Sequence, residues 1–392
     1  MRILVANIGS TSFKFQLFDI ASKRSLAQGR VERIGQPGGD CPDYETAIDR
    51  CLATLVGPRK PLADLSELSA IGFKAVHAGP GPGLRFVDDE LFSDMERFCF
   101  LAPAHNPPYI RAMRAFRDRH PKIPLVALFE TAFFSMAEES RTYAVPFAWK
   151  EELGIQRYGF HGASHRYAAE RAATLLGRTD LRQVSCHLGG SSSLAAIKDG
   201  AGIDSSFGMS PQSGLPHNNR VGEIDAFAVL YAMKQLGIGI DEMASILARE
   251  SGLAGISGVG GDLRDLEAAG GNQRAKLALD VFVYWIRHYL GAFMLQLGGL
   301  DVLSFSGGIG ENRAAIRRRV CTGLESFGLV VDPRLNRKIS GELDIAALES
   351  KVRVLVIPAN EEWIVARHAA ELISSNTPGG GADETPRAPR GI

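Results

Sequence analysis

A strand, a turn rich in Gly, Ser and Thr, and a second strand occur in the same order at two places in the chain. This repeat constrains the fold more than any other feature of the sequence. The first strand of each unit is mostly apolar, and the strand after the first turn alternates apolar and polar side chains. The segments are 2–7, 9–12 and 13–19 in the first unit, and 184–188, 189–193 and 194–197 in the second. The repeat predicts an internal duplication, with two similar halves and a cleft between them.

Strands alternate with helical segments along the rest of the chain. A buried strand at 124–129, a strand at 302–306 that leads into Gly307 to Asn312, and a strand at 352–357 add to the two hairpins. Apolar residues recur at helical spacing at 107–118, 164–177, 223–236, 241–250, 274–298 and 311–327. This alternation predicts the α/β class. The Pro- and Gly-rich segment 376–392 is predicted to be disordered.

Charge and composition argue against several classes of partner. The 392 residues carry 44 Lys and Arg against 44 Asp and Glu, so neither nucleic acid nor an anionic membrane is expected as the main partner. No apolar run approaches the roughly 18 residues that span a bilayer, and Asn7 interrupts the apolar start too early for a signal peptide. The five cysteines show no C-x-x-C spacing, which favours reduced thiols in a cytoplasmic protein.

The Gly-, Ser- and Thr-rich turns are candidate anion sites. Such turns leave backbone N–H groups and hydroxyls free to hold a phosphate. One turn alone is weak evidence, because many hairpins carry Gly and Ser for turn chemistry alone, but two similar turns and a third after 302–306 favour a nucleotide. The chain has no G-x-x-x-x-G-K-[ST] sequence, and Gly307 to Gly310 does not match G-x-G-x-x-G, so a P-loop and a dinucleotide fold are both disfavoured.

A few titratable side chains stand near these turns. His161 and His165 have the spacing of a zinc pair, but the Glu of H-E-x-x-H is absent and zinc is disfavoured. His161, on the loop before the helix, is instead placed to donate to a phosphate.

Basic and acidic residues complete a candidate site for phosphoryl transfer. Lys14, Lys74 and Arg220 are single basic residues that suit a transferring phosphoryl group, whose charge must be held. Glu130 follows the strand at 124–129, and Glu361 follows the strand at 352–357 and is a candidate Mg²⁺ ligand. Taken alone, each of these basic residues is more often a solvated charge, and each acidic residue is at least as readily a surface charge.

Together, blocks of residues in chain order resemble the acetate kinase family, also called acetokinases or short-chain acyl kinases. They are Asn7-x-Gly-Ser-Thr-Ser-x-Lys14, Val76-His77-x-Gly79, Leu101-Ala-Pro-x-His105-Asn-Pro-Pro108, Thr131-Ala-Phe133, Tyr158-Gly-Phe-His-Gly-x-Ser-His165, His187-Leu-Gly189, Gly308-Ile-Gly-Glu-Asn312 and Pro358-x-Asn-Glu-Glu362. The resemblance extends from residue 1 to about residue 373.

The resemblance implies a two-domain actin/sugar-kinase-like fold, a homodimer, and reversible transfer of the ATP γ-phosphoryl group to acetate with Mg²⁺ or Mn²⁺. It implies an N-terminal domain of 1–132 with a returning C-terminal helix at 363–375, and a nucleotide-binding domain of 133–362. An acetate carboxylate is ionised at neutral pH, so no strong base is needed. The site must bring two anions together, which is expected of Arg, Lys, protonated His and Mg²⁺.

The resemblance also implies a role for each matching residue. Glu130, His161 and Arg220 are the implied catalytic residues, and Asn7 and Glu361 lie near the metal. The implied substrate-binding residues are Lys74, Val76, Ala104, Phe160 and Pro211. The implied ATP-binding residues are Lys14, His187, Leu188, Gly189, Gly190, Ser191, Asp262, Leu263, Arg264, Gly308, Ile309, Gly310, Glu311 and Asn312.

Several positions depart from the family pattern. The chain has Lys74 where the family has the substrate-binding Arg, Glu130 where it has Asp, and Ala104 where it usually has Leu. It also has Phe134 for His, Gly190 for Asn, and Asn218-Asn219 for Gly-Thr.

These departures leave alternatives open. A Leu-to-Ala change at 104 predicts a wider acyl pocket for propionate or butyrate, unless neighbouring side chains fill the space. The altered site is also compatible with a weakly active or non-catalytic nucleotide-binding paralogue, against which stand the retained His161 and Arg220.

Overall fold

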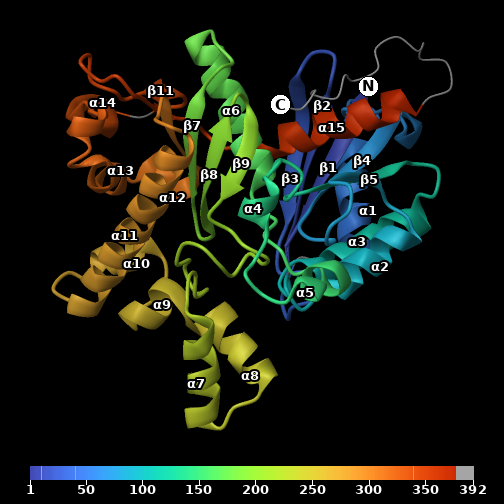
Figure 1. Ribbon diagram of the computed structural model, residues 1–392. Coiled ribbons are helices and arrows are strands. Elements are labelled where there is room, and N and C mark those ends of the chain that lie inside the picture. Colours follow the sequence, from blue (N-terminus) through green and yellow to red (C-terminus); the bar gives the residue numbers. More distant parts are fainter. Residues whose placement is uncertain (10, 40, 339, 377–392) are drawn as a thin grey trace.

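The computed structural model describes residues 1–9, 11–39, 41–338 and 340–376. Two six-stranded sheets form its framework (Figure 1). The first contains β1 (Arg2–Ile8), β2 (Phe13–Asp19), β3 (Arg24–Val31), β4 (Leu68–Ala75), β5 (Leu84–Phe86) and β6 (Leu125–Phe129). The second contains β7 (Arg182–Leu188), β8 (Ser192–Lys198), β9 (Ala201–Ser205), β10 (Val302–Ser306), β11 (Leu343–Asp344) and β12 (Arg353–Val356).

The two sheets have the same topology, as the repeated hairpin predicts. Their strand orders are β3-β2-β1-β4-β6-β5 and β9-β8-β7-β10-β12-β11. In each sheet the hairpin and the strand after it form an antiparallel meander, two further strands add in parallel, and a short antiparallel strand closes the edge. The parallel strands place the carboxyl ends of β1, β4 and β6 at one edge of the first sheet.

Helices separate and flank the sheets. The first sheet is covered on one face by α1 (Tyr44–Leu55), α2 (Asp89–Arg97) and α3 (Asn106–Arg119), and the second by α11 (Gln273–Gln296) and α13 (Ala314–Cys321). Between the sheets lie α6 (Gly162–Leu176), which packs on the second sheet, and α15 (Glu361–Ser375), which packs on the first. The other helices are α4 (Glu138–Arg141), α5 (Phe147–Leu153), α7 (Ala226–Leu236), α8 (Ile240–Ser245), α9 (Gly252–Ser257), α10 (Leu263–Ala268), α12 (Gly307–Asn312) and α14 (Pro333–Arg337).

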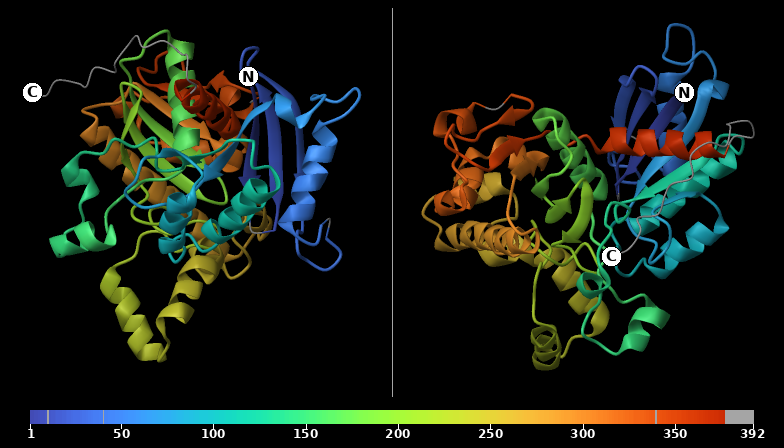
Figure 2. Two further views of the ribbon diagram at one scale, coloured as in Figure 1. Left: turned by 90° about the vertical axis from the view of Figure 1, so that its right-hand side faces the viewer. Right: turned by 45° about the horizontal axis from the view of Figure 1, so that its top comes forward.

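The last helix returns to the first sheet. Figure 2 shows α15 crossing from the second half of the molecule to the strands of the first. A Cβ at Gly72 on β4 would lie 3.0 Å from Val365 Cγ1, so the helix and the sheet are in close contact. We therefore propose the division into 1–132 with 363–375 and 133–362, since each part contains one sheet. Most of the predicted tail, 377–392, lies outside the described residues, as does Ser10 of the first turn.

The prediction of one continuous helix at 311–327 is wrong. The chain forms α12 directly after β10, leaves helical geometry at Arg313 and resumes as α13, so 308–312 is helical rather than a turn. The Arg317 guanidinium is buried and donates to the carbonyl oxygens of Gly310 (2.6 Å) and Glu311 (2.9 Å). These carbonyls lie at the end of α12, so the buried charge stabilises the break. The helix predicted at 223–236 begins only at Ala226, after its N-cap Asp225.

Candidate active site

A cavity of about 280 Å³ lies where the ends of β1, β4 and β6 face the second half of the molecule. It collects side chains that are far apart in the sequence. Its walls contain ten of the predicted residues, namely Asn7, Lys14, Lys74, Val76, Glu130, Phe160, His161, Ser191, Pro211 and Arg220. They also contain Gly9 and Ser12 of the first candidate anion turn, and three residues to which the sequence analysis gave no role, namely Ile8, His105 and Tyr109.

Lys74 is held between two buried carboxylates. Its ammonium lies 3.2 Å from Glu130 Oε1 and donates a hydrogen bond to Glu361 Oε2. Lys74 comes from β4, Glu130 from the end of β6 and Glu361 from the start of α15. The three residues therefore connect the first sheet with the start of the last helix.

The three groups shift one another's pKa values. Burial raises the pKa of Glu130 to about 7, against the opposing effect of Lys74. Burial also opposes the charge on Glu361, but Lys74 and His187 lower the pKa of that carboxyl to about 2. Burial likewise opposes the charge on Lys74, but the two glutamates raise its pKa well above the usual value. At acidic pH the arrangement is an ion pair of Lys74 with Glu361 beside a protonated Glu130, whose Oε2 is buried without a hydrogen-bond partner among the described residues.

This arrangement predicts a pH dependence of stability. Because the folded pKa of Glu130 lies above its usual 4.5, its contribution to the free energy of unfolding is full below about pH 4.5 and is lost as pH rises toward about 7. Glu130→Gln, which is neutral at all pH, is expected to flatten this decline in urea titrations across that range. Exposed Glu349→Gln is the control. Equal pH slopes for Glu130→Gln and wild type would contradict the expectation.

His161 and Arg220 lie on the wall contributed by the second half of the molecule. His161 adopts a left-handed backbone conformation (φ 58°) at the N-cap of α6, and its Nδ1 lies 2.8 Å from Ser193 Oγ. Burial, together with His187 and His165, lowers the pKa of His161 well below its usual value. In the protein alone this shift favours the neutral imidazole, as a donor, over the protonated form expected from the sequence. Arg220 donates from Nη1 to Pro211 O (2.8 Å), and burial lowers its pKa only to about 10, so it remains a cation.

The predicted metal ligands meet the requirements of Mg²⁺ in part. Asn7 Oδ1 accepts from the Tyr109 hydroxyl (3.3 Å), and its amide donates to Glu362 Oε1 (3.3 Å). Among the described residues no group of three or more His, Cys, Asp and Glu could hold a metal. Mg²⁺ is usually bound by one or two carboxylates with substrate phosphates and water. Glu361 fits such a site, with Asn7 near it.

Two of the predicted nucleotide segments, 187–191 and 308–312, meet next to the cavity. The ring of His187, at the end of β7, lies 4.4 Å from that of His161. A Cβ at Gly307 would lie 2.6 Å from Leu188 O, so the start of α12 packs directly on β7 and requires glycine at its positive φ. Asp262 caps α10 by accepting from Arg264 N (2.8 Å).

Two departures from the family pattern are neighbours in space. The backbone N–H of Asn218 donates to Gly190 O (3.1 Å), and a Cβ at Gly190 would lie 3.4 Å from Asn218 Nδ2. The Asn218 amide therefore lies beside Gly190, the position at which the family pattern has an asparagine side chain. Each departure was visible in the sequence, but their contact was not.

Three of the four residues predicted to form an acyl wall line the cavity. Val76, Phe160 and Pro211 are buried and line the cavity. Ala104 is exposed and is not part of this wall, to which His105 contributes instead. The expectation that Ala104 widens the pocket is therefore not supported by the geometry.

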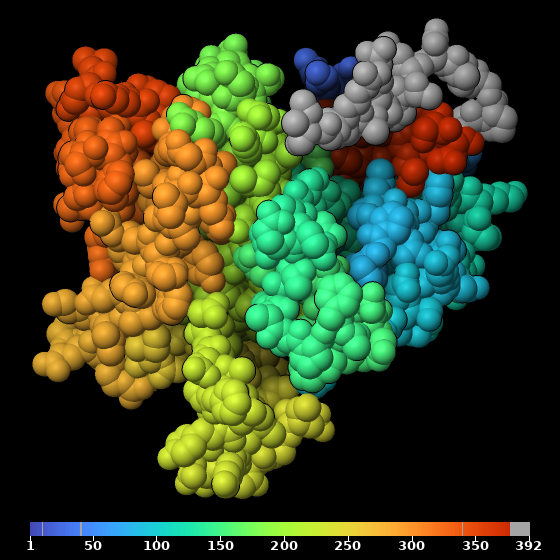
Figure 3. All heavy atoms as spheres, in the orientation of Figure 1, coloured from blue at the N-terminus to red at the C-terminus, as the bar shows by residue number. Residues whose placement is uncertain are grey.

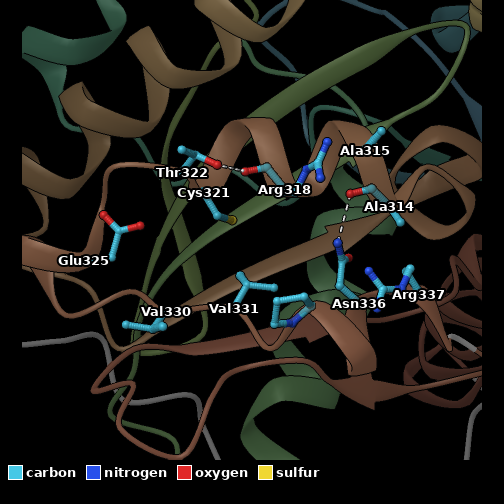
Figure 4. Close-up of a pocket in the computed structure, with 11 residues that line it drawn as sticks. Ala314, Ala315, Arg318, Cys321, Thr322, Glu325, Val330, Val331, Asn336 and Arg337 are labelled. Atoms are coloured by element: carbon cyan, nitrogen blue, oxygen red, sulfur yellow. Dashed lines mark hydrogen bonds between the residues drawn. The ribbon is translucent and has the colours of Figure 1, made fainter.

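A second cavity, of about 300 Å³, lies between α13 and α14 and contains none of the predicted site residues. Figure 4 shows Arg318 and Arg337 at its wall, with Asn336 Nδ2 donating to Ala314 O (2.9 Å). The first cavity, rather than this one, unites the titratable groups.

The two sheets of the same topology define a protein of the actin and sugar-kinase fold class. The cavity between them has Lys, Arg and His side chains that suit anions. The chain belongs to the acetokinase family, whose sequence model matches residues 2–367. It is similar to the acetate kinase of Clostridium botulinum strain Loch Maree (39% identity, 95% of this chain and 99% of that protein). It is also similar to acetate kinase 2 of Listeria monocytogenes (40% identity, 96% and 99%).

Solved structures agree with this assignment. The crystal structure of Porphyromonas gingivalis acetate kinase matches with a TM-score of 0.85 and 36% identity, over 95% of this chain and 99% of that one. A propionate kinase from Francisella tularensis matches with a TM-score of 0.84 and 31% identity, over 94% and 98%. The family and the fold expected from the sequence are therefore confirmed.

Proposed function

We propose that this protein transfers the γ-phosphoryl group of ATP to acetate, reversibly, with Mg²⁺ or Mn²⁺ as the metal. A carboxylate oxygen of acetate forms the new P–O bond, the bond from γ-phosphorus to the bridging oxygen breaks, and ADP leaves with that electron pair. The observation that carries the proposal is the single cavity in which Arg220, His161 and Lys74 meet an apolar wall. Acetate has this combination of a charged end and a methyl group.

The chain's own residues hold the reacting groups. Arg220 and the neutral His161 offer N–H donors to the equatorial oxygens of the transferring group, which stabilises charge that is spread in the transition state. Lys74 attracts the substrate carboxylate, and Val76 contacts its methyl group. Mg²⁺, when bound near Glu361 and Asn7, would neutralise charge on the phosphates. The segments at 187–191, 262–264 and 308–312 are proposed to hold the nucleotide.

The direct test is ATP-dependent formation of acyl phosphate, trapped with hydroxylamine, for acetate, propionate and butyrate in parallel. The highest kcat/KM is expected for acetate. A maximum at propionate would favour the second candidate function, to which the likeness to a propionate kinase also points. Nucleotide binding without product from any of the three acids would favour a non-catalytic paralogue.

The apolar wall predicts a change of acyl preference. Val76→Ala removes two methyl groups from the cavity and is expected to raise the propionate-to-acetate ratio of kcat/KM by about 10-fold, because one methylene in an apolar pocket is worth at least that. Ala104→Leu is the matched control, because Ala104 is exposed and should leave the ratio unchanged. A ratio that responds to Ala104→Leu and not to Val76→Ala would place the acyl group elsewhere.

We also propose that the protein is a cytoplasmic homodimer. Its five cysteines are all free, which supports a reducing compartment. No helix in the described part of the chain is long and apolar enough to cross a membrane. A second copy is the proposed partner of α7 and the adjoining start of α8, which project from the rest of the molecule (Figures 1 and 3).

The surface of α7 supports this partner. The helix has no buried residue, although Lys234 is its one charged side chain. Phe227 (78% exposed), Tyr231 (67%) and Leu236 (67%) lie on it, and Ile240 (63%) follows. An apolar patch of this kind marks an interface.

Phe227→Asp with Tyr231→Asp is therefore expected to convert a dimer into a monomer in sedimentation equilibrium. Leu348→Asp, which changes a fully exposed leucine (103%) outside α7 and α8, should leave the dimer intact. A dimer that persists in the double variant would place the interface elsewhere.

A further inference from the structure

A chain of hydrogen bonds runs from His161 away from the cavity into the protein interior. His161 Nδ1 lies 2.8 Å from Ser193 Oγ, and the same oxygen lies 2.8 Å from His165 Nε2. His165 Nδ1 lies 2.9 Å from Ser185 Oγ. Ser185, Ser193 and His165 have no exposed surface, and they come from β7, β8 and α6. Three separate elements therefore fix one imidazole at the cavity.

The number of protons in this chain is fixed. Burial lowers the pKa of His165 to about 3 and that of His161 well below its usual value. Each ring therefore carries one proton at neutral pH, and each hydroxyl carries one. Ser193 Oγ contacts two ring nitrogens and has no other hydrogen-bond partner in the described part of the chain, so its own proton is satisfied only if it accepts from one ring and donates to the other. Only two directions of the whole chain satisfy this condition.

The two directions differ at Ser185. In one, Ser185 donates to His165 Nδ1, His165 Nε2–H donates to Ser193, and Ser193 donates to His161 Nδ1. In the reverse direction His165 Nδ1–H donates to Ser185, whose own proton then needs another acceptor. The described part of the chain gives the Ser185 hydroxyl no other hydrogen-bond partner. A buried hydroxyl proton without an acceptor is costly, so the first direction is favoured.

We propose that Ser185, His165 and Ser193 are positioning residues that fix His161 in the tautomer with its proton on Nε2, aimed at the transferring phosphoryl group. This inference rests on the proposed phosphoryl transfer for its purpose but not for its geometry. The reverse direction would present the Nε2 lone pair to phosphate oxygens and repel them. The direction that lets the neutral His161 ring donate from Nε2 is thus set by Ser185, at the far end of the hydrogen-bond chain and 24 residues from His161 in the sequence.

The tautomer is measured directly by nitrogen NMR of protein labelled with ¹⁵N-histidine. The two ring nitrogens of a neutral imidazole have distinct shifts according to which one carries the proton. The His161 signals are assigned by their loss in His161→Gln. We expect the proton on Nε2 in the wild-type protein without ligand. A proton on Nδ1 would overturn the proposal whether or not the protein forms acyl phosphate. Absence of acyl phosphate in the hydroxylamine assay, with the proton on Nε2, would instead overturn the proposed function.

Two variants test how the tautomer is set. Ser193→Ala removes the donor to His161 Nδ1 and is expected to populate both tautomers and to lower kcat by about 10- to 100-fold, the usual effect of outer hydrogen-bond partners, with the KM for ATP little changed. Ser185→Ala leaves the cavity untouched but removes the group that sets the direction, and should also mix the tautomers. Ser304→Ala is the matched control: Ser304 is a buried serine on β10 that contacts Gln183 (2.8 Å) and no histidine. Unchanged His161 shifts in both test variants would overturn the proposal.

Discussion

Arg220→Ala is expected to lower kcat by about a thousandfold or more, the scale on which an arginine stabilises a transferring phosphoryl group. Pro211 O is the one hydrogen-bond acceptor that the described residues offer to its guanidinium, so its remaining N–H groups are available to the cavity that it lines. Burial does not remove its charge, because its pKa of about 10 keeps it protonated at neutral pH.

The measurement is kcat for acyl phosphate formation at saturating ATP and acetate. Arg220→Lys should recover part of the loss, because lysine keeps the charge and loses the planar fork. Arg178→Ala serves as the control for loss of an arginine, since Arg178 pairs with Asp180 at the surface. A kcat for Arg220→Ala within tenfold of wild type would exclude Arg220 from the transition state.

Lys74→Met is expected to lower the free energy of unfolding by about 3–5 kcal/mol, the cost of leaving a buried charge without its partner. Lys74 is 18% exposed, and it is the shared cation of Glu130 and Glu361. Without it, His187, whose Nδ1 lies 3.9 Å from Glu361 Oε1, is the one ion-pair partner that the described residues leave to the Glu361 carboxylate. Glu361 begins α15 and lies 287 residues from Lys74 in the sequence. Because this contact ties the start of α15 to β4, its loss should also loosen the start of α15.

Urea denaturation at neutral pH measures this loss. The variant that combines Lys74→Met with Glu130→Gln and Glu361→Gln should regain much of the stability, because no uncompensated charge is then buried. Lys198→Met, at the exposed end of β8, controls for the loss of a lysine from a strand. If Lys74→Met costs no more than Lys198→Met, the ion pairs contribute nothing to the fold.

The sequence by itself determined the framework and the family. The repeated strand, turn and strand predicted two halves, and the sheets of the structure repeat one topology. Such patterns are local, because the alternation of side chains in a strand and the glycines of a turn follow from backbone geometry within a few residues. The blocks around Asn7, His161 and Glu361 identified the family, and the cavity brings together the predicted residues of the first two.

Only the tertiary structure decided what these side chains do to one another. It lowers the pKa of His161 through burial and through groups that come from separate elements, which favours the neutral ring. It showed that Ala104 is exposed and that His105 and Tyr109 reach the cavity, which depends on how α3 packs against the first sheet. It broke the helix predicted at 311–327, because the buried Arg317 binds the carbonyl oxygens at the end of α12. Burial and charge at long sequence separation are properties of the folded chain, and no local pattern contains them.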